Sequence, residues 1–413
     1  MSDNSAKKYK KDPADEASDR WLSEQKGLAA KRRPFDMALL ISLAVIILVF
    51  GALIFALPSE DFSYEENRVL ASFPEFSFES LVSGEFTSGI GEFYADRFPF
   101  RNIFVGLKAA AEKLMLKLEN NDVIEGADGY LIERLEYTEG EYATARDNLL
   151  AIEKFIGYAE GKGIDSSVVI LPRSIDVMRS KLPELYGTER ADAIWGVVSN
   201  AYPSVIRLDG LLRERAEAGE YVWYKTDHHY TTLGAYYTYV ALADELGYEP
   251  YPIEHFDLEV ISDEFLGTTY SSSGIKWSDT DTFTLFRYAG DGDFTVSYPG
   301  STKKSLDGFY DESFFTEKDK YSAFLGGNRA RTSIRLDGGE DRPILMMVKD
   351  SFSHSLAPFL ALHFDIEMVD LRYYQSSAAK LIDEIAPDRI LILYGIDTLA
   401  TSTEAARIRM GVK

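Results

Sequence analysis

Hydrophobic residues along this chain of 413 residues form one long block near the start and several short blocks farther on. The long block, residues 37–57, contains no charged residue. At about 1.5 Å per helical residue it is long enough to cross a hydrocarbon core of about 30 Å. It exceeds the apolar region of a signal peptide, and the following "LPSEDF" offers no small-residue cleavage site. We therefore predict an uncleaved transmembrane helix at 37–57.

The charges beside this block predict its orientation. Lys31, Arg32 and Arg33 come just before it, and acidic residues follow it at positions 60, 61, 65 and 66. Positive charge collects on the cytoplasmic side of membrane helices. We expect a single-pass protein of the cell membrane, with residues 1–36 as a cytoplasmic tail and the large domain outside the cytoplasm.

The short blocks alternate between strand-like and helix-like patterns. Apolar strands are predicted at 166–172, 204–209, 344–348, 366–371 and 389–395, and helices at 147–163, 189–200, 231–246 and 377–386. Fully apolar strands that alternate with helices are typical of a parallel sheet covered on both faces. The predicted fold class is α/β, a parallel sheet sandwiched by helices.

The pattern also predicts a domain organisation. Residues 58–135, with several aromatic residues and turn signals, are predicted to form a membrane-proximal collar, and 136–413 the α/β domain. Between about 251 and 342, scattered Gly, Ser, Thr and aromatic residues indicate a β-rich insertion before the sheet resumes.

Composition narrows the chemistry. The chain has no cysteine, which excludes disulfides, thiolate nucleophiles and sulfur-based zinc sites. Its net charge of −23, without a basic stripe, argues against nucleic acid as a partner. Any nucleophile must be an oxygen or an amine.

Two loops at predicted strand ends carry candidate chemistry, because functional groups collect beyond the carboxyl ends of parallel strands. Ser351 follows the strand 344–348 and precedes a helical stretch, a context that exposes a hydroxyl and aims backbone N–H groups at an oxyanion. Asp227 and His229 lie in "YKTDHHYTT", close enough for the carboxylate to hold the imidazole. Together they would form a Ser-His-Asp triad.

Other interpretations stay open at this point. Asp227 or Thr231 can simply cap the helix at 231–246, and "DHH" can bind a metal, although further carboxylates in a convincing context are missing. Pro358 must either start the helix after Ser351 or kink it. His354 is a second candidate base, and Ser271–Ser273 are alternative nucleophiles.

Seven segments, in order along the chain, resemble the DHHW family of bacterial membrane-anchored proteins, relatives of the alginate O-acetylation proteins AlgJ and AlgX with their SGNH-hydrolase-like domain. They are "ENRVLASFPEF", "DRFPFR", "NDVIEGADGYL", "VVILPRS", "YKTDHHYTTLGA", "FLGTTYSSSG" and "VKDSFSHSLAPFLALHF" with "VDLRYY". The resemblance covers nearly all of the predicted extracytoplasmic part. Tyr230 stands where the family name has tryptophan, and Lys349 where many SGNH relatives have glycine.

The resemblance implies an activity and partners. Asp227, His229 and Ser351 would be the catalytic triad of an O-acetyltransferase or esterase acting on a cell-surface polysaccharide. A multi-span membrane O-acyltransferase would deliver the acetyl groups. We expect neither a cofactor nor a metal for this chemistry. A non-catalytic glycan-binding or assembly protein that serves the acyltransferase is the alternative.

Three further residues at predicted strand ends are candidates for substrate binding. They are Arg173, Arg372 and Tyr373, which can bind a sugar or acetyl oxygen. Ordinary surface ion pairs are an equally good explanation for the two arginines.

Overall fold

The computed structural model describes residues 12–57, 61–63, 65 and 68–412 and divides the chain into two compact units. One unit comprises residues 1–63 and 69–101, and the other comprises 64–68 and 102–413. Residues 1–11 of the predicted cytoplasmic tail, and Glu60 and Glu66 among the acidic residues after the apolar block, lie outside the described residues. The domain boundaries predicted from the sequence stay predictions.

The first unit is helical. Its α1 (Pro13–Ala56) contains the apolar block, and among the described residues it is the one helix long and apolar enough to cross a membrane. Helices α2 (Phe78–Ser83) and α3 (Glu85–Asp96) meet at Gly84, which adopts a left-handed conformation with φ of 87°. Phe86 of α3 packs edge-on against Phe76, with ring centres 5.1 Å apart.

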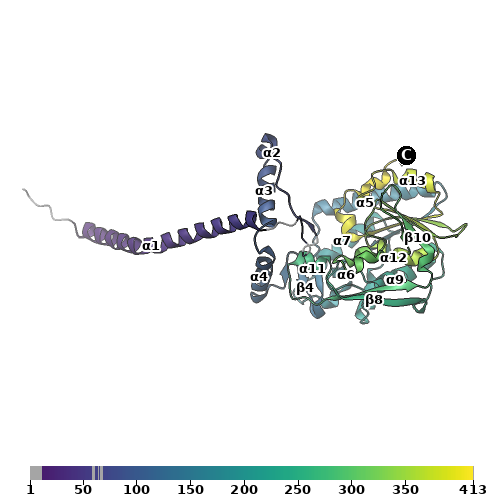
Figure 1. Ribbon diagram of the computed structural model, residues 1–413, viewed down its shortest axis with the longest axis horizontal. Coiled ribbons are helices and arrows are strands. Elements are labelled where there is room, and N and C mark those ends of the chain that lie inside the picture. Colours follow the sequence, from purple (N-terminus) through teal and green to yellow (C-terminus); the bar gives the residue numbers. More distant parts are fainter. Residues whose placement is uncertain (1–11, 58–60, 64, 66–67, 413) are drawn as a thin grey trace, which may run out of the picture. The chain divides into compact units, whose positions relative to one another are not determined.

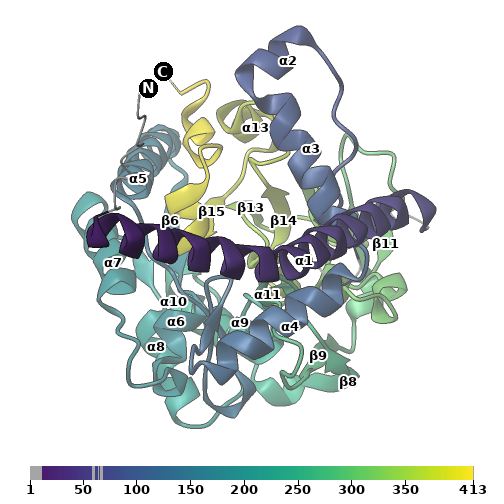
Figure 2. The same cartoon turned by 90° about the vertical axis from the view of Figure 1, so that its left-hand side faces the viewer.

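The second unit is built on a mixed sheet of eight strands, whose neighbours follow the order β11-β10-β12-β14-β13-β15-β6-β7. The strands are β11 (Leu306–Asp307), β10 (Phe294–Ser297), β12 (Arg331–Leu336), β14 (Asp365–Val369), β13 (Ile344–Lys349), β15 (Arg389–Gly395), β6 (Asp165–Leu171) and β7 (Ile206–Arg207). The five strands from β14 to β7 are parallel, as predicted. Figure 2 shows β6, β15, β13 and β14 side by side.

The β-rich segment at 251–342 is only partly the insertion that was predicted. Strands β8 (Phe256–Phe265) and β9 (Asp281–Tyr288) do form a separate antiparallel pair. However, β10, β11 and β12 join the central sheet with antiparallel pairing, so the sheet is not parallel throughout. The scattered aromatic and polar residues of this segment gave no clear strand pattern, and β12 pairs with β14, which comes later in the sequence.

Side chains alternate between the two faces of the parallel strands. Val168 and Ile170 of β6 face a core formed with α5 (Glu139–Glu160), α7 (Glu189–Ala201), α13 (Ala378–Ile385) and α14 (Ile396–Thr401). Val169 and Leu171 face the opposite core with α9 (Thr232–Ala241), α10 (Ala243–Leu246), α12 (Ser353–Ala361) and the β8–β9 pair. Figure 1 shows these two layers, with α5 and α13 on one side and α9, α12 and β8 on the other. The predicted helical sandwich is confirmed.

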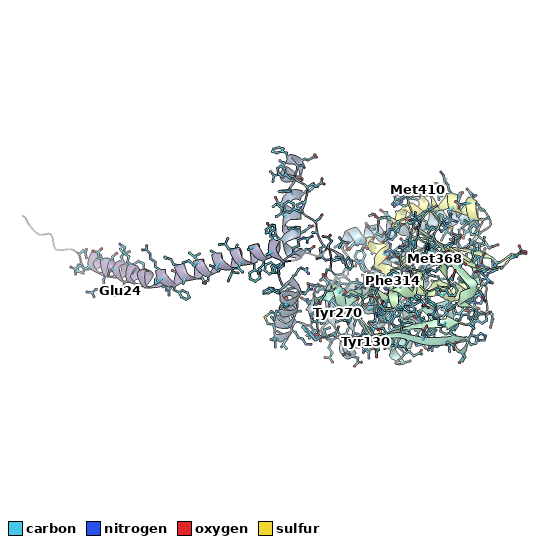
Figure 3. The ribbon with its side chains drawn as sticks, viewed as in Figure 1. Glu24, Tyr130, Tyr270, Phe314, Met368 and Met410 are labelled. Carbon is cyan, nitrogen blue, oxygen red and sulfur yellow. The ribbon has the colours of Figure 1, made fainter. Side chains whose placement is uncertain are left out.

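Smaller elements complete the unit. A three-stranded sheet contains β3 (Glu119–Asn120), β4 (Val123–Glu125) and β5 (Leu131–Glu133). The remaining strands and α-helices of the chain are β1 (Phe62–Ser63), which belongs to the first unit, β2 (Arg68–Val69), α4 (Arg101–Leu114), α6 (Ser174–Val177), α8 (Asp209–Glu217) and α11 (Thr268–Ser273). Figure 3 shows Met368 of β14 in the interior of the unit, where it is 1% exposed.

The C-terminal helices are fixed to α5 by Asn148, which is buried. Its Nδ2 donates to the carbonyl oxygens of Leu399 and Ser402, at 2.8 Å each. These two carbonyls lie at the end of α14, where a helix leaves acceptors without intrahelical partners.

We predict that Asn148→Ala lowers the free energy of unfolding by about 1–3 kcal/mol, because both carbonyls would be left buried without a donor. The measurement is the chemical unfolding midpoint of the full chain in detergent. Asn200→Ala, at an exposed position of α7, is the matched control. It should change the free energy of unfolding by less than about 0.5 kcal/mol. Equal losses in the two variants would contradict the role of Asn148.

Candidate active site

The segment with Asp227, His228 and His229 is a tight loop. An antiparallel bridge pairs Trp223 with Tyr230, and the N–H of Thr231 donates to Val222 at 3.0 Å. Thr231 then caps α9 by accepting from the N–H of Gly234 at 3.3 Å. The capping role that the sequence left open therefore belongs to Thr231, and Asp227 has other contacts.

Asp227, His229 and Ser351 form one hydrogen-bonded chain. Oδ1 of Asp227 lies 2.6 Å from Nδ1 of His229, and Nε2 of His229 lies 2.8 Å from Oγ of Ser351. A carboxylate only accepts, so Nδ1 carries the proton and Nε2 is left as the acceptor for the serine hydroxyl. The structure thus brings together the three residues that the sequence singled out, 122 positions apart between His229 and Ser351.

The Asp227 carboxylate is buried and fully engaged. Oδ1 also accepts from the backbone N–H of His229 at 3.0 Å, and Oδ2 accepts from the N–H and hydroxyl of Thr268 at 2.8 and 2.9 Å. Burial acts to raise the pKa of this carboxyl, but the neighbouring histidines and these donors lower it below its ordinary value. Asp227 is therefore held as an anion.

The contact with Thr268 requires glycine at position 267. A Cβ placed there would lie 2.3 Å from Cβ of Asp227, far inside van der Waals contact. The "FLGTTYSSSG" segment thus supplies two donors to Asp227, at the start of α11. Its serine hydroxyls form local hydrogen bonds. Each donates to a backbone carbonyl of the same segment, in Ser271, Ser272 and Ser273 alike.

Aromatic rings fix the His229 imidazole. Tyr321 is stacked on it with ring centres 3.8 Å apart and planes inclined by 7°, and Phe352 meets it edge-on at 5.0 Å. The Tyr321 hydroxyl donates to the carbonyl of Ser351 at 3.2 Å. One side chain therefore contacts both the imidazole and the backbone of the serine turn.

Ser351 lies between β13 and α12, at the carboxyl end of a parallel strand, and is half-buried. The buried Asp350 shapes this turn, because its two carboxylate oxygens accept the N–H groups of Phe352 and Gly395 at 3.1 and 2.7 Å. The N–H of Ser351 itself has no acceptor in the described part of the chain. Pro358 lies inside α12 rather than at its first position.

Tyr230 contributes more than packing to the turn. Its hydroxyl donates to the carbonyl of Phe352 at 2.8 Å. The tyrosine that replaces the tryptophan of the family name thus ties the histidine loop to the serine turn.

A second buried carboxylate, Asp281, holds the histidine loop from below. Its oxygens accept the N–H groups of Lys225 and Thr226 at 2.7 and 2.8 Å, and it also binds the hydroxyls of Tyr221 and Thr226. Sequence reasoning assigned no role to Asp281, Asp350, Thr268 or Tyr321. Asp350 and Thr268 stand in segments that carried a signal, whereas Asp281 and Tyr321 lie outside those segments.

His228 and His354 have other hydrogen-bond partners. His228 is bonded through Nδ1 to the hydroxyl of Thr268, and burial lowers its pKa to about 3. His354 lies with Nε2 2.7 Å from the ammonium of the buried Lys349, which also contacts Asp370 at 3.3 Å. The partner of the His354 imidazole is therefore the Lys349 side chain and not the Ser351 hydroxyl.

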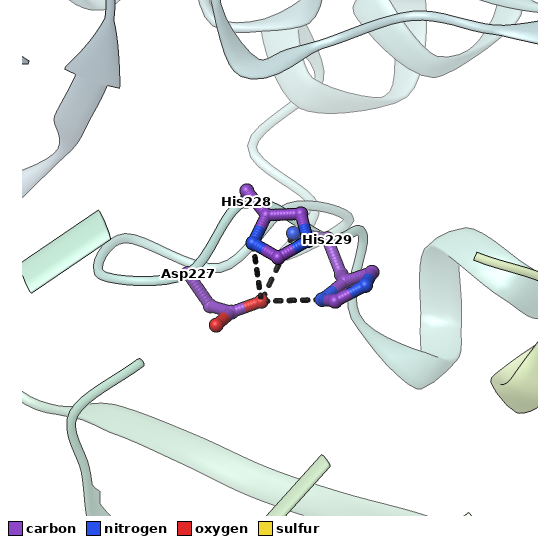
Figure 4. A group of neighbouring side chains, drawn as sticks. All are labelled: Asp227, His228 and His229. Atoms are coloured by element: carbon purple, nitrogen blue, oxygen red, sulfur yellow. Dashed lines mark hydrogen bonds and ion pairs between the residues drawn. The ribbon is translucent and has the colours of Figure 1, made fainter. Parts of the chain in front are cut away.

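The metal interpretation can be weighed from the same contacts. Ligand-type atoms of Asp227, His228 and His229 lie within 4.8 Å of one another, as a metal site would need. Figure 4 shows the carboxylate facing both histidines. However, the carboxylate and the facing Nδ1 of His229 are already 2.6 Å apart, a hydrogen-bond distance, and Nδ1 of His228 is bonded to Thr268. The donor set fits proton transfer better than metal coordination.

The three candidates for substrate binding also lie at strand ends. Arg173 is 5% exposed and paired with Glu133 and with Asp397, the latter at 2.7 Å. Arg372 forms two bonds to Asp370, at 2.7 and 2.9 Å. Tyr373 is 51% exposed. Both arginines have acidic partners, and only Tyr373 presents a largely open side chain.

Comparison with solved structures shows the fold. A DHHW family protein from Eubacterium siraeum is 22% identical with a TM-score of 0.57, and the match covers 70% of this chain and 95% of that one. PatB1 of Bacillus cereus, with a sulfonyl adduct, is 16% identical with a TM-score of 0.57, covering 68% and 98%. The O-acetyltransferase domain of Pseudomonas putida AlgJ is 15% identical with a TM-score of 0.43, covering 68% and 92%.

The comparison with curated proteins finds no match. Among protein families, residues 158–369 match the family described as DHHW protein. That match spans more than half of the chain and includes the histidine loop, the Asp281 anchor and the serine turn. The chain belongs to the DHHW family.

Proposed function

We propose that the protein is a membrane-anchored serine O-acetyltransferase or acetylesterase that acts outside the cytoplasm on a cell-surface polysaccharide. The observation that carries this proposal is the hydrogen-bonded chain from Asp227 through His229 to Ser351. Such a chain activates a hydroxyl as a nucleophile and supports the charge that develops on the imidazole.

In the first step, Nε2 of His229 takes the proton of the Ser351 hydroxyl while Oγ attacks the acetyl carbonyl of the donor. The bond to the donor then breaks, and His229 returns the proton to the leaving group. In the second step, His229 takes a proton from a sugar hydroxyl, whose oxygen attacks the acetyl-serine. The sugar ester forms and Ser351 regains its proton; with water as the acceptor, acetate is released instead.

The backbone supports the charge that develops on the carbonyl oxygen. Within the described part of the chain the N–H of Ser351 has no acceptor, whereas the nearby N–H groups of Phe352 and Gly395 donate to Asp350. We assign the oxyanion contact to the Ser351 N–H. Asp227 orients His229 and stays ionised, consistent with its lowered pKa.

The acceptor and the acetyl source are also part of the proposal. Tyr373, which is 51% exposed, and the adjacent Arg372 would contact the glycan. Arg173 would contribute to binding through Glu133 and Asp397, the carboxylates with which it is paired. Helix α1 would anchor the chain, with the basic residues before its apolar block in the cytoplasm. A multi-span O-acyltransferase of the same membrane would supply acetyl groups.

Two similarities support a nucleophilic serine and acetyl chemistry. PatB1, which shares the fold, is described with a sulfonyl adduct, and such adducts form when a nucleophile attacks sulfur. The DHHW segments also resemble those of alginate O-acetylation proteins.

We predict that Ser351→Ala lowers the rate of acetyl ester hydrolysis by the full chain in detergent about 10⁴-fold or more, because the nucleophile is lost. Release of nitrophenol from nitrophenyl acetate measures the rate. Ser272→Ala is the matched control, since Ser272 belongs to the alternative serine segment and its hydroxyl donates to the carbonyl of Thr269 in that segment. In cells, acetylation of the polysaccharide should be lost in the Ser351 variant alone.

Two outcomes would contradict the proposal. Polysaccharide acetylation that survives Ser351→Ala would favour a non-catalytic glycan-binding role. Activity lost in Ser272→Ala but kept in Ser351→Ala would move the nucleophile to α11. Far-ultraviolet circular dichroism of each variant identifies misfolding.

A third prediction concerns the dependence of stability on pH. His228 has a folded pKa of about 3, below its ordinary value of 6.5. Below about pH 6.5 the unfolded chain therefore binds a proton at His228 that the folded chain does not bind. The free energy of unfolding decreases as the pH is lowered through this range. We predict that His228→Gln removes about 1–2 kcal/mol of the stability lost between about pH 7.5 and about pH 5.

Unfolding midpoints of the wild type and the variant at both pH values test this prediction. His255→Gln, at an exposed histidine, should follow the wild type. His354 and His363 also have lowered pKa values, so they too make the protein less stable at lower pH. Their effect is the same in the wild type and in both variants. Parallel pH curves for the His228 variant and the wild type would show that His228 is not held neutral.

A further inference from the structure

Helix α4 exposes an apolar row to solvent. Ile103, Leu107 and Leu114 are 60%, 59% and 86% exposed, and their spacing places them on one side of the helix. Ala109, on the other side, is buried. An amphipathic helix of a soluble domain normally turns its apolar side inward, but α4 also presents one outward.

The turn after α4 continues this apolar surface. Leu114, Met115 and Leu116 are 86%, 73% and 88% exposed. Leu116 has a φ of 63°, in the left-handed region that favours glycine. A leucine here gains nothing from burial within the chain and is strained by its backbone, so local folding does not explain it. We call Ile103, Leu107 and residues 114–116 the α4 apolar face.

Lysines and a tryptophan border this face. Lys113 and Lys117 stand on either side of residues 114–116, with side chains 43% and 48% exposed. Each has an acidic partner, Glu125 at 2.6 Å and Glu112 at 3.5 Å. The Lys113 ammonium also lies 4.7 Å from the ring centre of Trp277, which is partly exposed. Long cationic side chains and tryptophan beside an apolar surface are typical of the membrane–water interface.

We propose that the α4 apolar face inserts into the headgroup region of the lipid bilayer and forms a second, peripheral membrane contact of this protein. The proposal rests on the anchoring by α1 set out above, because the same chain would then hold this face close to a bilayer. In a chain with a net charge of −23, a border of lysines is the part suited to anionic headgroups. A bilayer demands apolar area and flanking cations, and α4 offers both.

The contact would bear on the active site through short connections. Helix α4 approaches the segment after α11: Cγ of Lys276 would meet a Cβ on Gly106, and Val105 one on Gly274. Helix α11 begins with Thr268, whose N–H and hydroxyl bind Asp227. A bilayer contact at α4 would therefore fix the orientation of the unit that carries the triad.

The absence of cysteine makes a direct test possible. Leu114→Cys in the full chain, labelled with an environment-sensitive nitrobenzoxadiazole dye and reconstituted in lipid nanodiscs, reports on the surroundings of the α4 apolar face. We expect a blue-shifted emission and loss of most of its intensity when the lipids carry spin labels just below the headgroups. Leu185→Cys, at a position 93% exposed, is the matched control and should stay aqueous.

Each outcome is decisive. Quenching at position 114 alone, stronger with anionic than with zwitterionic lipid, supports the proposal. Aqueous emission at both positions overturns it. Shielding at position 114 only after a membrane extract is added also overturns it, in favour of a protein partner. Repeating the measurement with Ser351→Ala separates this inference from the catalytic one, because the dye response needs no nucleophile.

Discussion

A carboxylate withdrawn from water needs donors for both of its oxygens, and the architecture of the candidate active site follows from meeting that need for Asp227. Its four contacts come from His229 and Thr268, two residues on different segments. Once the carboxylate is satisfied in this way, the imidazole has one orientation and presents Nε2 to Ser351. The histidine loop, Gly267 and α11 are all required to build this one buried anion.

Two further buried aspartates bind backbone N–H groups in the same way. Asp281 binds backbone N–H groups of the histidine loop, and Asp350 binds those of the serine turn and of Gly395 at the end of β15. Burial raises the pKa of both carboxyls, while their hydrogen bonds counteract this effect. Three buried aspartates thus replace the backbone ladder in a region where neither helix nor strand supplies partners.

Local pattern was sufficient to predict the parallel strands, and it placed Asp227, His229 and Ser351 among the candidate residues, beside alternatives that it left open. Strands such as 344–348 are apolar throughout. The polar residues that follow the ends of parallel strands must meet at one edge of the sheet. The antiparallel strands β10 to β12 escaped prediction because their pairing is set by distant partners rather than by local alternation. The role of Tyr321 was not predicted for a related reason. Its stacking on His229 depends on tertiary packing, which the local sequence around a tyrosine does not indicate.

The stacked tyrosine has a consequence for how protons travel. With Tyr321 flat against its face and Phe352 at 5.0 Å, the His229 ring cannot turn over without first pushing these neighbours apart. In the proposed reaction its Nδ1 proton would stay facing Asp227 throughout, so only Nε2 would exchange protons. The hydrogen taken from Ser351 would then be the one that His229 returns to the leaving group.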